Sequence, residues 1–467
     1  MLYKKLSLIL AAILVVAAQF SFSQESEEPT VVLFTNVNVW DGTSDQLATG
    51  TDVLVVGNKI SKIGKGLTES GAQVVDGNGG TLIPGLLDMH QHLLLHGGTA
   101  AGTYDWDAYI QGAQAYKMMK KFLYMGYTTI RDIGGNSISL SRAVRSGYID
   151  GPRIYTSGPV ISQTGGHGDW GSYNDGPNDL DYQEKTQNTF VVDGVDEVIR
   201  AVRWNYKSGA SFIKIMGGGG VASVYDPLNA TQLTFEEMKA AVDISEDYGS
   251  YVAIHAYHDR SYNRALDAGV KSFEHGFLIT EPTVERMAET EGVFWSWQPF
   301  GSYTLFAGGF PDWFSEDMIV KGTAVNKGST VVPKLMKKHG VMVILGSDMF
   351  GAEARFALTN IISAAEVPGS GYTSLDVMKM ATSNAGKVCA MSGPGRDYYK
   401  EAKLGVVEEG AWADIIIMNG NPIDDVHVLE ETDNMKLIMR DGKIYKNILV
   451  SPDDENYKTI PEEFRVN

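Results

Sequence analysis

The 467-residue sequence contains a single cysteine, Cys389, so no disulfide can form within the chain. Basic residues are also few, because 39 lysines and arginines stand against 57 aspartates and glutamates and leave a net charge of −18. A chain this acidic repels phosphate groups, so we expect neither a nucleic-acid partner nor binding to an anionic membrane. The acidic residues are spread along the sequence, which favours a role in solubility.

Long hydrophobic runs are absent except near the amino end. There, Lys4 and Lys5 precede an apolar stretch over residues 6–20, and small serines follow it. This order is typical of a secretory signal peptide, and the apolar stretch is short for a membrane-spanning helix. We therefore predict a signal peptide at 1–23 and a soluble exported protein of the periplasm. No cysteine lies nearby to carry a lipid anchor, so no stable membrane anchor is expected.

A glycine-rich nucleotide-binding turn is missing as well. No GxGxxG motif opens a βα turn, and this disfavours an open, doubly wound sheet. The four glycines at 217–220 lack the helix-opening spacing and an acidic partner, so we interpret them as a flexible loop. The length predicts two or three domains, and 43% hydrophobic residues are typical of a globular enzyme.

The middle of the chain, from 84 to 400, alternates β-branched runs with amphipathic helical segments. Eight strand-like runs end near residues 92, 132, 158, 216, 257, 276, 299 and 348. This α/β pattern predicts a (β/α)8 TIM barrel. Short β-like runs at 31–83 and 401–450 flank it, so we expect one small discontinuous β-sandwich domain built from both flanks. A polar tail follows at 451–467.

Metal-ligating side chains stand at or just past the ends of these strands, where barrels of this kind carry their active sites. Singly, each has an ordinary explanation, such as a hydrogen-bonded core histidine, a lysine in an ion pair or a helix-capping aspartate. Together, and in barrel order, they predict a site for a divalent transition metal. The six residues are His90, His92, Lys214, His255, His275 and Asp348.

Longer stretches of the sequence resemble the amidohydrolase superfamily, and the resemblance covers nearly all of the chain after the signal peptide. These stretches include LIPGLLDMHQH, GYTTIRDIGG, IKIMGGGGV, ILGSD and LGVVEEGAWADIIIMNG. The TGGHGD and HAY…EHG segments are most similar to a metal-dependent branch. That branch includes Xaa-Pro dipeptidases, related carboxypeptidases and ochratoxin-hydrolysing amidases.

The resemblance implies two divalent ions, with zinc the expected metal, and a Lys214 that is carboxylated by CO2 and bridges them. An ammonium cannot bind a cation, and burial beside positive metals favours the loss of its proton. By the same resemblance, one ion is held by His90, His92 and Asp348, and the other by His255 and His275. A hydroxide shared by the two ions would attack an amide carbonyl, and Asp348 would carry the proton to the leaving nitrogen.

Two further residues resemble positions that contact the carboxylate or carbonyl of the substrate. His167 lies in a glycine-rich loop after the third strand. Tyr257 follows His255 by two residues, so the side chains of Tyr257 and His255 should point to the same side of the strand. Aromatic residues of two long loops are expected to shape the pocket, namely Trp170, Tyr173, Tyr303 and Trp313. Structural or solvated roles are expected for Asp88, Arg131, Asp132, His96, His258, His339 and His427.

The sequence therefore predicts an exported hydrolase of the amide bonds of dipeptides or N-acyl amino acids. Two alternatives stay open. A cyclic-amide, lactone or organophosphate hydrolase would share this metal site. A metal-binding or scaffold protein without catalysis would be marked by a missing ligand, and none is missing. The side-chain preference, the native metal and the oligomeric state, a homo-oligomer included, are not readable from the sequence.

Overall fold

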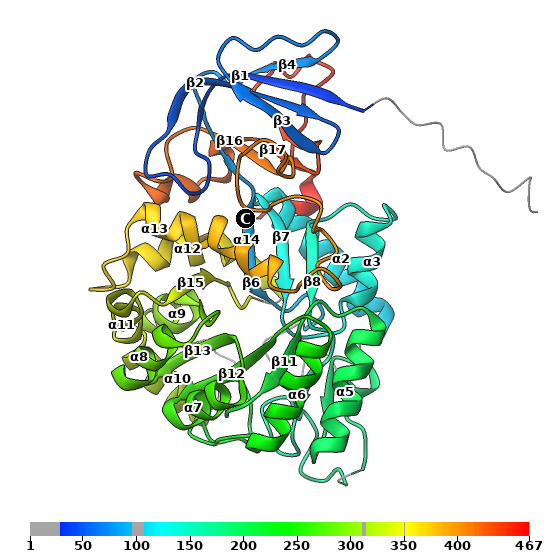
Figure 1. Ribbon diagram of the computed structural model, residues 1–467, viewed down its shortest axis with the longest axis vertical. Coiled ribbons are helices and arrows are strands. Elements are labelled where there is room, and N and C mark those ends of the chain that lie inside the picture. Colours follow the sequence, from blue (N-terminus) through cyan, green and yellow to red (C-terminus); the bar gives the residue numbers. More distant parts are fainter. Residues whose placement is uncertain (1–28, 96–106, 177, 311–313, 350, 467) are drawn as a thin grey trace, which may run out of the picture.

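Figure 1 shows a β-rich part stacked above a larger α/β part. The computed structural model describes residues 29–95, 107–176, 178–310, 314–349 and 351–466. The predicted signal peptide at 1–23, His96 and Trp313 lie outside these described residues. No helix within the described ranges is both long enough and apolar enough to cross a membrane.

The β-rich part is one eight-stranded sheet to which both flanks of the chain contribute. Its strands are β1 (Val31–Val39), β2 (Ala48–Val56), β3 (Lys59–Gly64), β4 (Gln73–Asp76), β5 (Thr81–Pro84), β16 (Ile415–Met418), β17 (Met435–Arg440) and β18 (Lys443–Asn447). Their order is β18-β17-β16-β5-β1-β2-β3, with β4 paired to β1. The antiparallel pairing of β16 with β5 joins the two flanks.

This sheet has a hydrophobic core of its own, because apolar residues recur at every second position of several strands. The sheet also curves back toward its other end. Ile60 in β3 donates its N–H to the carbonyl of Ala411 at 3.0 Å, just before β16. The buried residues of this core include Val32, Phe34, Val53, Val55, Leu82, Ile415, Ile417, Leu437 and Met439. Whether the sheet forms the two layers of a sandwich stays a prediction.

The larger part confirms the α/β prediction, since its strands form two parallel sheets. The strands are β6 (Leu86–Gln91), β7 (Tyr127–Asp132), β8 (Arg153–Thr156), β9 (Val160–Ser162), β10 (Thr189–Val191), β11 (Ile213–Met216), β12 (Val252–His258), β13 (Ser272–Leu278), β14 (Phe294–Trp297) and β15 (Met342–Leu345). One sheet has the order β6-β7-β8 and the other β10-β9-β11-β12-β13-β14-β15.

Two connections bring the edges of these parallel sheets together. β8 lies within the third predicted strand, and β9 follows it after only three residues, so the chain passes directly from one parallel sheet into the other. At the other edge, the N–H of Asp348, which follows β15, donates to the carbonyl of His90 in β6 at 2.8 Å. The carboxyl ends of the parallel strands therefore lie around a common centre. Closure into a complete barrel stays a prediction.

Helices pack around the parallel strands, and their ends carry standard caps (Figure 1). Thr234 and Glu237 form a capping box at the start of α6, and Gly269 ends α7 with a left-handed φ of 97°. The α-helices are α2 (Ala108–Tyr124), α3 (Ile138–Arg145), α4 (Tyr182–Lys185), α5 (Val195–Ser208), α6 (Phe235–Asp247), α7 (Asp259–Ala268), α8 (Glu281–Glu289), α9 (Leu305–Ala307), α10 (Glu316–Gly328), α11 (Val332–His339), α12 (Ala357–Glu366), α13 (Ser374–Met380) and α14 (Ser383–Ala390). One segment, η2 (Phe300–Thr304), is a π-helical turn. The short 3-10 helices are η3 (Gly351–Phe356), η4 (Val426–Leu429), η5 (Thr432–Asn434) and η6 (Glu462–Phe464).

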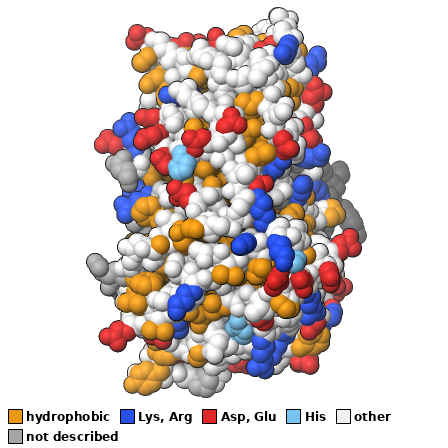
Figure 2. Space-filling model, turned by 90° about the vertical axis from the view of Figure 1, so that its left-hand side faces the viewer, with side chains coloured by type: hydrophobic (Ala, Val, Ile, Leu, Met, Phe, Trp, Pro, Cys, Tyr) orange, Lys and Arg blue, Asp and Glu red, His pale blue; other side chains and the backbone are white. Residues whose placement is uncertain are grey.

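The surface matches the scattered charges of the sequence. Figure 2 shows the side that carries α8, α11 and α13, where acidic and basic side chains alternate without a large area of one sign. The predicted polar tail at 451–467 runs back to α2 in its described part. There the Phe464 ring stacks on Tyr124 with centroids 5.9 Å apart. The end of the chain thus packs against the α/β part.

Candidate active site

One cavity of about 670 Å³ opens where the carboxyl ends of the parallel strands meet. All six predicted metal ligands line it, and so do the two predicted substrate-binding residues. They come from β6 and the residue after it, β11, β12, β13, and the segments after β9 and β15. These lining residues are His90, His92, His167, Lys214, His255, Tyr257, His275 and Asp348.

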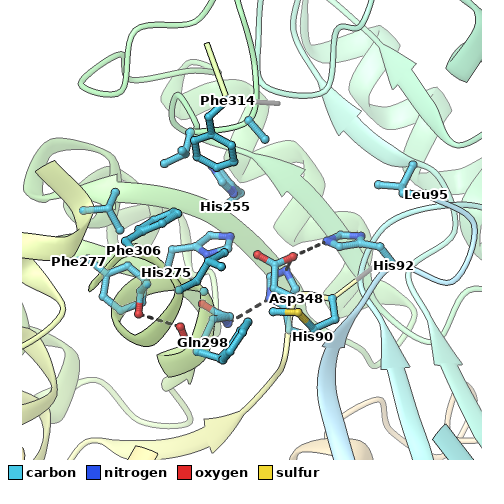
Figure 3. A pocket seen from close by; sticks show the side chains of 18 of the residues that line it. His90, His92, Leu95, His255, His275, Phe277, Gln298, Phe306, Phe314 and Asp348 are labelled. Atoms are coloured by element: carbon cyan, nitrogen blue, oxygen red, sulfur yellow. Dashed lines mark hydrogen bonds and ion pairs between the residues drawn. The ribbon is translucent and has the colours of Figure 1, made fainter. Parts of the chain in front are cut away.

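Within the cavity, ligand atoms of His90, His275 and Asp348 form one compact group. These atoms all lie within 4.8 Å of one another, which is near enough to share one ion. The Asp348 carboxylate also lies 3.2 Å from Nε2 of His92 and 3.5 Å from Nε2 of His90. Figure 3 shows Asp348 between the His92 and His275 rings. This donor set of imidazoles and a carboxylate suits zinc or a similar divalent ion.

The first two histidines are oriented by hydrogen bonds on their other ring nitrogen. Nδ1 of His90 lies 2.7 Å from the Glu274 carboxylate, and Nδ1 of His92 lies 3.1 Å from the carbonyl of Gly134. A carbonyl or carboxylate oxygen accepts, so each Nδ1 carries the hydrogen and each Nε2 keeps its lone pair. Both lone pairs then face the Asp348 side, as metal ligands require.

The remaining histidine ligands are neutral imidazoles. The Nε2 atom of His255 lies 3.3 Å from the carbonyl of Gly219, so Nδ1 is its lone-pair nitrogen. Burial lowers the pKa of His255 and His275 well below the usual range, and it lowers that of His90 to about 4. Their rings are close, with the centroids of His255 and His275 4.4 Å apart. Neutral, clustered imidazoles are the form that binds a metal.

Lys214 stands on β11 and is 1% exposed. Burial lowers the pKa of its amine to about 8, although Glu274 and Asp348 act in the opposite direction. No residue in the described part of the chain hydrogen-bonds to the amine. A larger fraction of neutral amine favours both metal ligation and reaction with CO2, so the surroundings of Lys214 fit the role that the sequence implies.

Backbone strain marks two of the ligands. His275 and Asp348 have left-handed φ angles of 66° and 55°, which cost non-glycine residues about 1–2 kcal/mol each. Gly346 allows the end of β15 to approach β6 closely, because a Cβ at this position would lie 2.2 Å from the Cβ of His90. Backbone strain and close packing therefore accompany the orientation of these side chains toward the cavity.

Sequence reasoning missed Glu274, which is fully buried below the ligands. Its carboxylate accepts from Arg131 at 2.6 Å and from Ser272 at 2.5 Å, and it contacts His90. Arg131, for which a structural or solvated role was expected, is buried behind the predicted ligands. Asp88 has the expected structural role, since it accepts from the N–H and hydroxyl of Ser347. The available signal for Glu274 was an acidic residue directly before His275 in a buried strand.

His167 is held against the metal ligands. Its ring stacks on His255 with centroids 4.0 Å apart, and Nδ1 lies 2.7 Å from the Ser223 hydroxyl and 3.3 Å from the Asp226 carboxylate. Burial raises the pKa of Asp226, but hydrogen bonds led by His167 bring it below the ordinary value. The Asp226 carboxylate and the Ser223 hydroxyl therefore fix the His167 ring from behind and leave its Nε2 atom toward the cavity that the ring lines.

The glycines at 217–220 are buried and closely packed, in contrast to the flexible loop expected from the sequence. A Cβ on Gly220 would lie 1.9 Å from the His167 ring, and one on Gly219 would lie 2.0 Å from the carbonyl of Pro227. The interpretation was wrong because these glycines provide space for neighbouring groups. Sequence alone does not show how near those neighbours are.

The weaker predictions have mixed positions. Trp170 lines the cavity, whereas Tyr173 is 81% exposed and Tyr303 is not among the lining residues. Phenylalanines of the second loop, at 300–314, and of nearby segments take the lining positions instead. Three of the histidines expected to be solvated or structural are described, and they are not among the cavity-lining residues: His258 contacts the carbonyl of Ala230, His339 contacts Glu281 and His427 contacts Glu430.

Several known proteins are similar to this chain in sequence and in fold. The sequence profile of the amidohydrolase family matches residues 81–445. An ochratoxinase from Aspergillus niger is 29% identical over 394 residues, which span 79% of this chain and 77% of that protein. A solved prolidase complexed with N-methylphosphonate-L-proline has a TM-score of 0.81 and 31% identity, covering 90% of this chain and 100% of the other. A Xaa-Pro dipeptidase with bound methionine has a TM-score of 0.77 and 31% identity, covering 89% and 100%. The chain therefore belongs to the amidohydrolase family and is a hydrolase that acts on carbon–nitrogen bonds.

Proposed function

We propose that this hydrolase uses two divalent metal ions to cleave amide bonds of dipeptides or N-acyl amino acids. The observation that carries the proposal is the convergence of six metal-ligating side chains on one cavity, with the lone pairs of the His90 and His92 Nε2 atoms turned toward Asp348. The similarity to an ochratoxinase, a prolidase and a Xaa-Pro dipeptidase supports it. Zinc is the proposed metal, and a carboxylated Lys214 is the proposed bridge between the ions.

Bound ions would lower the pKa of a water molecule and polarise the amide carbonyl. Asp348 supplies the acid–base chemistry from the chain itself. Burial raises its pKa, but His90, His92 and His275 bring the pKa well below the usual range, so the carboxylate is ionised. It can accept the proton of the attacking water and return it to the leaving nitrogen. Asp348 lies at the cavity surface with 29% of its side chain exposed, where water can reach it.

The metal site predicts a measurable metal content. Purified protein should hold about two zinc-like ions per chain, because two ions need the six ligands that line the cavity. Elemental analysis checks this, and His275→Ala should lower the content. His427→Ala is the matched control, since His427 pairs with Glu430 outside the cavity. One ion or fewer, even after supplementation with metal and bicarbonate, would contradict the binuclear site.

Substrate choice depends on His167 and Tyr257, which we propose to hold a free carboxylate. The Tyr257 ring stacks on His275 with centroids 5.2 Å apart, and both Tyr257 and His167 line the cavity. A dipeptide should then be cleaved at least about tenfold faster than its C-terminal amide, because the amide leaves polar groups of the site without their partner. Tyr257→Phe should raise KM without loss of metal.

The comparison of one dipeptide with its amide is a kinetic measurement of kcat/KM. Equal rates for the two compounds would remove the carboxylate clamp. They would favour the alternative of a cyclic-amide, lactone or organophosphate hydrolase, which a panel of those substrates tests directly. Unchanged KM in Tyr257→Phe would assign the clamp to His167 alone.

We further propose a closed (β/α)8 barrel with a small β-sandwich domain, and export after removal of residues 1–23. The hydrogen bonds from Asp348 to His90 and from Ile60 to Ala411 support the two closures. The lysines and apolar stretch before residue 23 support export. The intact mass of the protein recovered from a periplasmic extract would show whether the signal peptide is removed.

A further inference from the structure

Six phenylalanines line the active-site cavity. Figure 3 shows Phe277 and Phe306 beside His275 and Phe314 above it, while Leu95 lies near His92 on the other side. We call these rings the phenylalanine wall. Its members are Phe277, Phe300, Phe306, Phe310, Phe314 and Phe356.

The wall is an ordered arrangement of rings that contact one another. The ring centroids are 5.1 Å apart for Phe306 and Phe310, 5.9 Å for Phe306 and Phe314, and 5.7 Å for Phe310 and Phe314. Gly322 of α10 lies behind it, where a Cβ would come within 2.6 Å of the Phe310 ring. A glycine in the middle of a helix weakens that helix, so its presence here indicates that the position of the ring matters.

Charged groups are sparse beside the wall. Among the described residues that line the cavity, the only carboxylate is that of Asp348, at the metal-ligand end. The guanidinium of Arg355 lies 4.7 Å from the centre of the Phe356 ring, and Phe356 itself stacks on Phe300 at 4.9 Å. The cavity thus has a polar end that can carry out hydrolysis and an apolar side that can only select by shape and hydrophobicity.

We propose that the phenylalanine wall binds a bulky apolar group, and preferably an aromatic ring, attached next to the scissile amide. Substrates would then be N-aroyl amino acids, or N-acyl amino acids and dipeptides with a large apolar side chain. The inference rests on the proposed amide hydrolysis. Binding of a substrate ring would bury apolar surface of the partly exposed phenylalanines, which is energetically favourable. The centroid distances within the wall are also those at which aromatic rings pack favourably.

Matched substrate pairs test the wall on each side of the amide. N-benzoylglycine is compared with N-acetylglycine, and N-acetylphenylalanine with N-acetylalanine, using the metal-loaded enzyme. We expect kcat/KM to favour the aromatic member of at least one pair by about tenfold to a hundredfold. Phe306→Ala should reduce that preference to about threefold or less while hydrolysis of the small member continues. Phe310→Ala serves as a second variant if Phe306→Ala does not fold.

Phe190→Ala is the matched control. Phe190 is also a partly buried phenylalanine packed on the same core, with its ring 5.1 Å from that of Trp204, but it does not line the cavity. The control should keep the aromatic preference of the unmodified enzyme. Equal kcat/KM within both pairs would overturn the wall and leave amide hydrolysis standing.

Failure of the enzyme to cleave any of these amides is a separate outcome, because it would contradict the proposed function and leave the wall to be tested by binding. If no amide is cleaved, calorimetric binding of benzoate against acetate, and of phenylalanine against alanine, decides the role of the wall. Tighter binding of the aromatic compound that disappears in Phe306→Ala would support the wall although hydrolysis had failed. Equal binding of the aromatic and small compounds would overturn both inferences.

Discussion

His167 shows how a single side chain of this site is oriented from behind. Its Nδ1 faces the Asp226 carboxylate at 3.3 Å, and Asp226 is itself 2% exposed and accepts from the N–H of Gly220 at 2.8 Å. Lys321 anchors the same loop through the carbonyls of Ser223 and Asp226, at 2.9 and 3.0 Å. Asp226 is not among the described residues that line the cavity, so we assign it the role of a positioning residue for His167.

Asp226→Asn should raise KM for substrates with a free carboxylate by about tenfold to a hundredfold and change kcat less. The reason is that a hydrogen bond to a charged group contributes about 1.5–3 kcal/mol, and asparagine removes the charge of the carboxylate that orients the His167 ring. Steady-state kinetics and metal analysis on the same preparation measure this. Ser223→Ala removes the other Nδ1 contact without changing a charge and should have a smaller effect. An unaltered KM would refute the role of Asp226.

The elements that carry the site differ in how far the sequence predicts them. Strand ends are predictable, because apolar runs stop at polar ligands such as His90 and Asp348, and their order follows the chain. Glu274 is not, since its partner Arg131 lies 143 positions away in the sequence. The short strand β9 after the third predicted strand was not expected, and the π-helical turn η2 places Phe300, in place of the expected Tyr303, on the cavity.

The loop that begins at Gly217 provides a test at the level of an element. Gly220→Ala places a Cβ 1.9 Å from the His167 ring, and His167 cannot retreat because it stacks on His255. Overpacking of this kind costs about 1–3 kcal/mol, so we expect a lower melting temperature and a loss of kcat/KM. Gly112→Ala in α2 is the control, since no atom lies within 4 Å of its Cβ and alanine favours a helix. A Gly220→Ala enzyme with normal Tm and kinetics would restore the flexible-loop interpretation.

At the scale of the whole molecule, one buried arginine links the α/β part to the β-rich sheet. Arg153 stands on β8 and is 1% exposed. Its guanidinium pairs with Asp414, lies 2.8 Å from the Asp441 carboxylate and lies 4.5 Å from the centre of the Trp412 ring. These partners come from the C-terminal flank, so one buried cation joins this flank to β8 of the α/β part.

Arg153→Leu should destabilise the protein by about 3–5 kcal/mol, because it leaves Asp414, 4% exposed, buried without a cation. Adding Asp414→Asn should recover part of this loss, since the amide oxygen can still accept from the N–H of Asp441 that now bonds Asp414 at 2.8 Å. Urea unfolding, followed by tryptophan fluorescence and by circular dichroism, measures the midpoint of the unfolding transition. Different midpoints from the two signals would show that the α/β part and the β-rich sheet unfold separately. Arg200→Leu is the matched control, because its side chain is 76% exposed and its pair with Glu197 contributes little. If Arg153→Leu unfolded at the same urea concentration as the control, with both signals coincident, the junction would not depend on this ion pair.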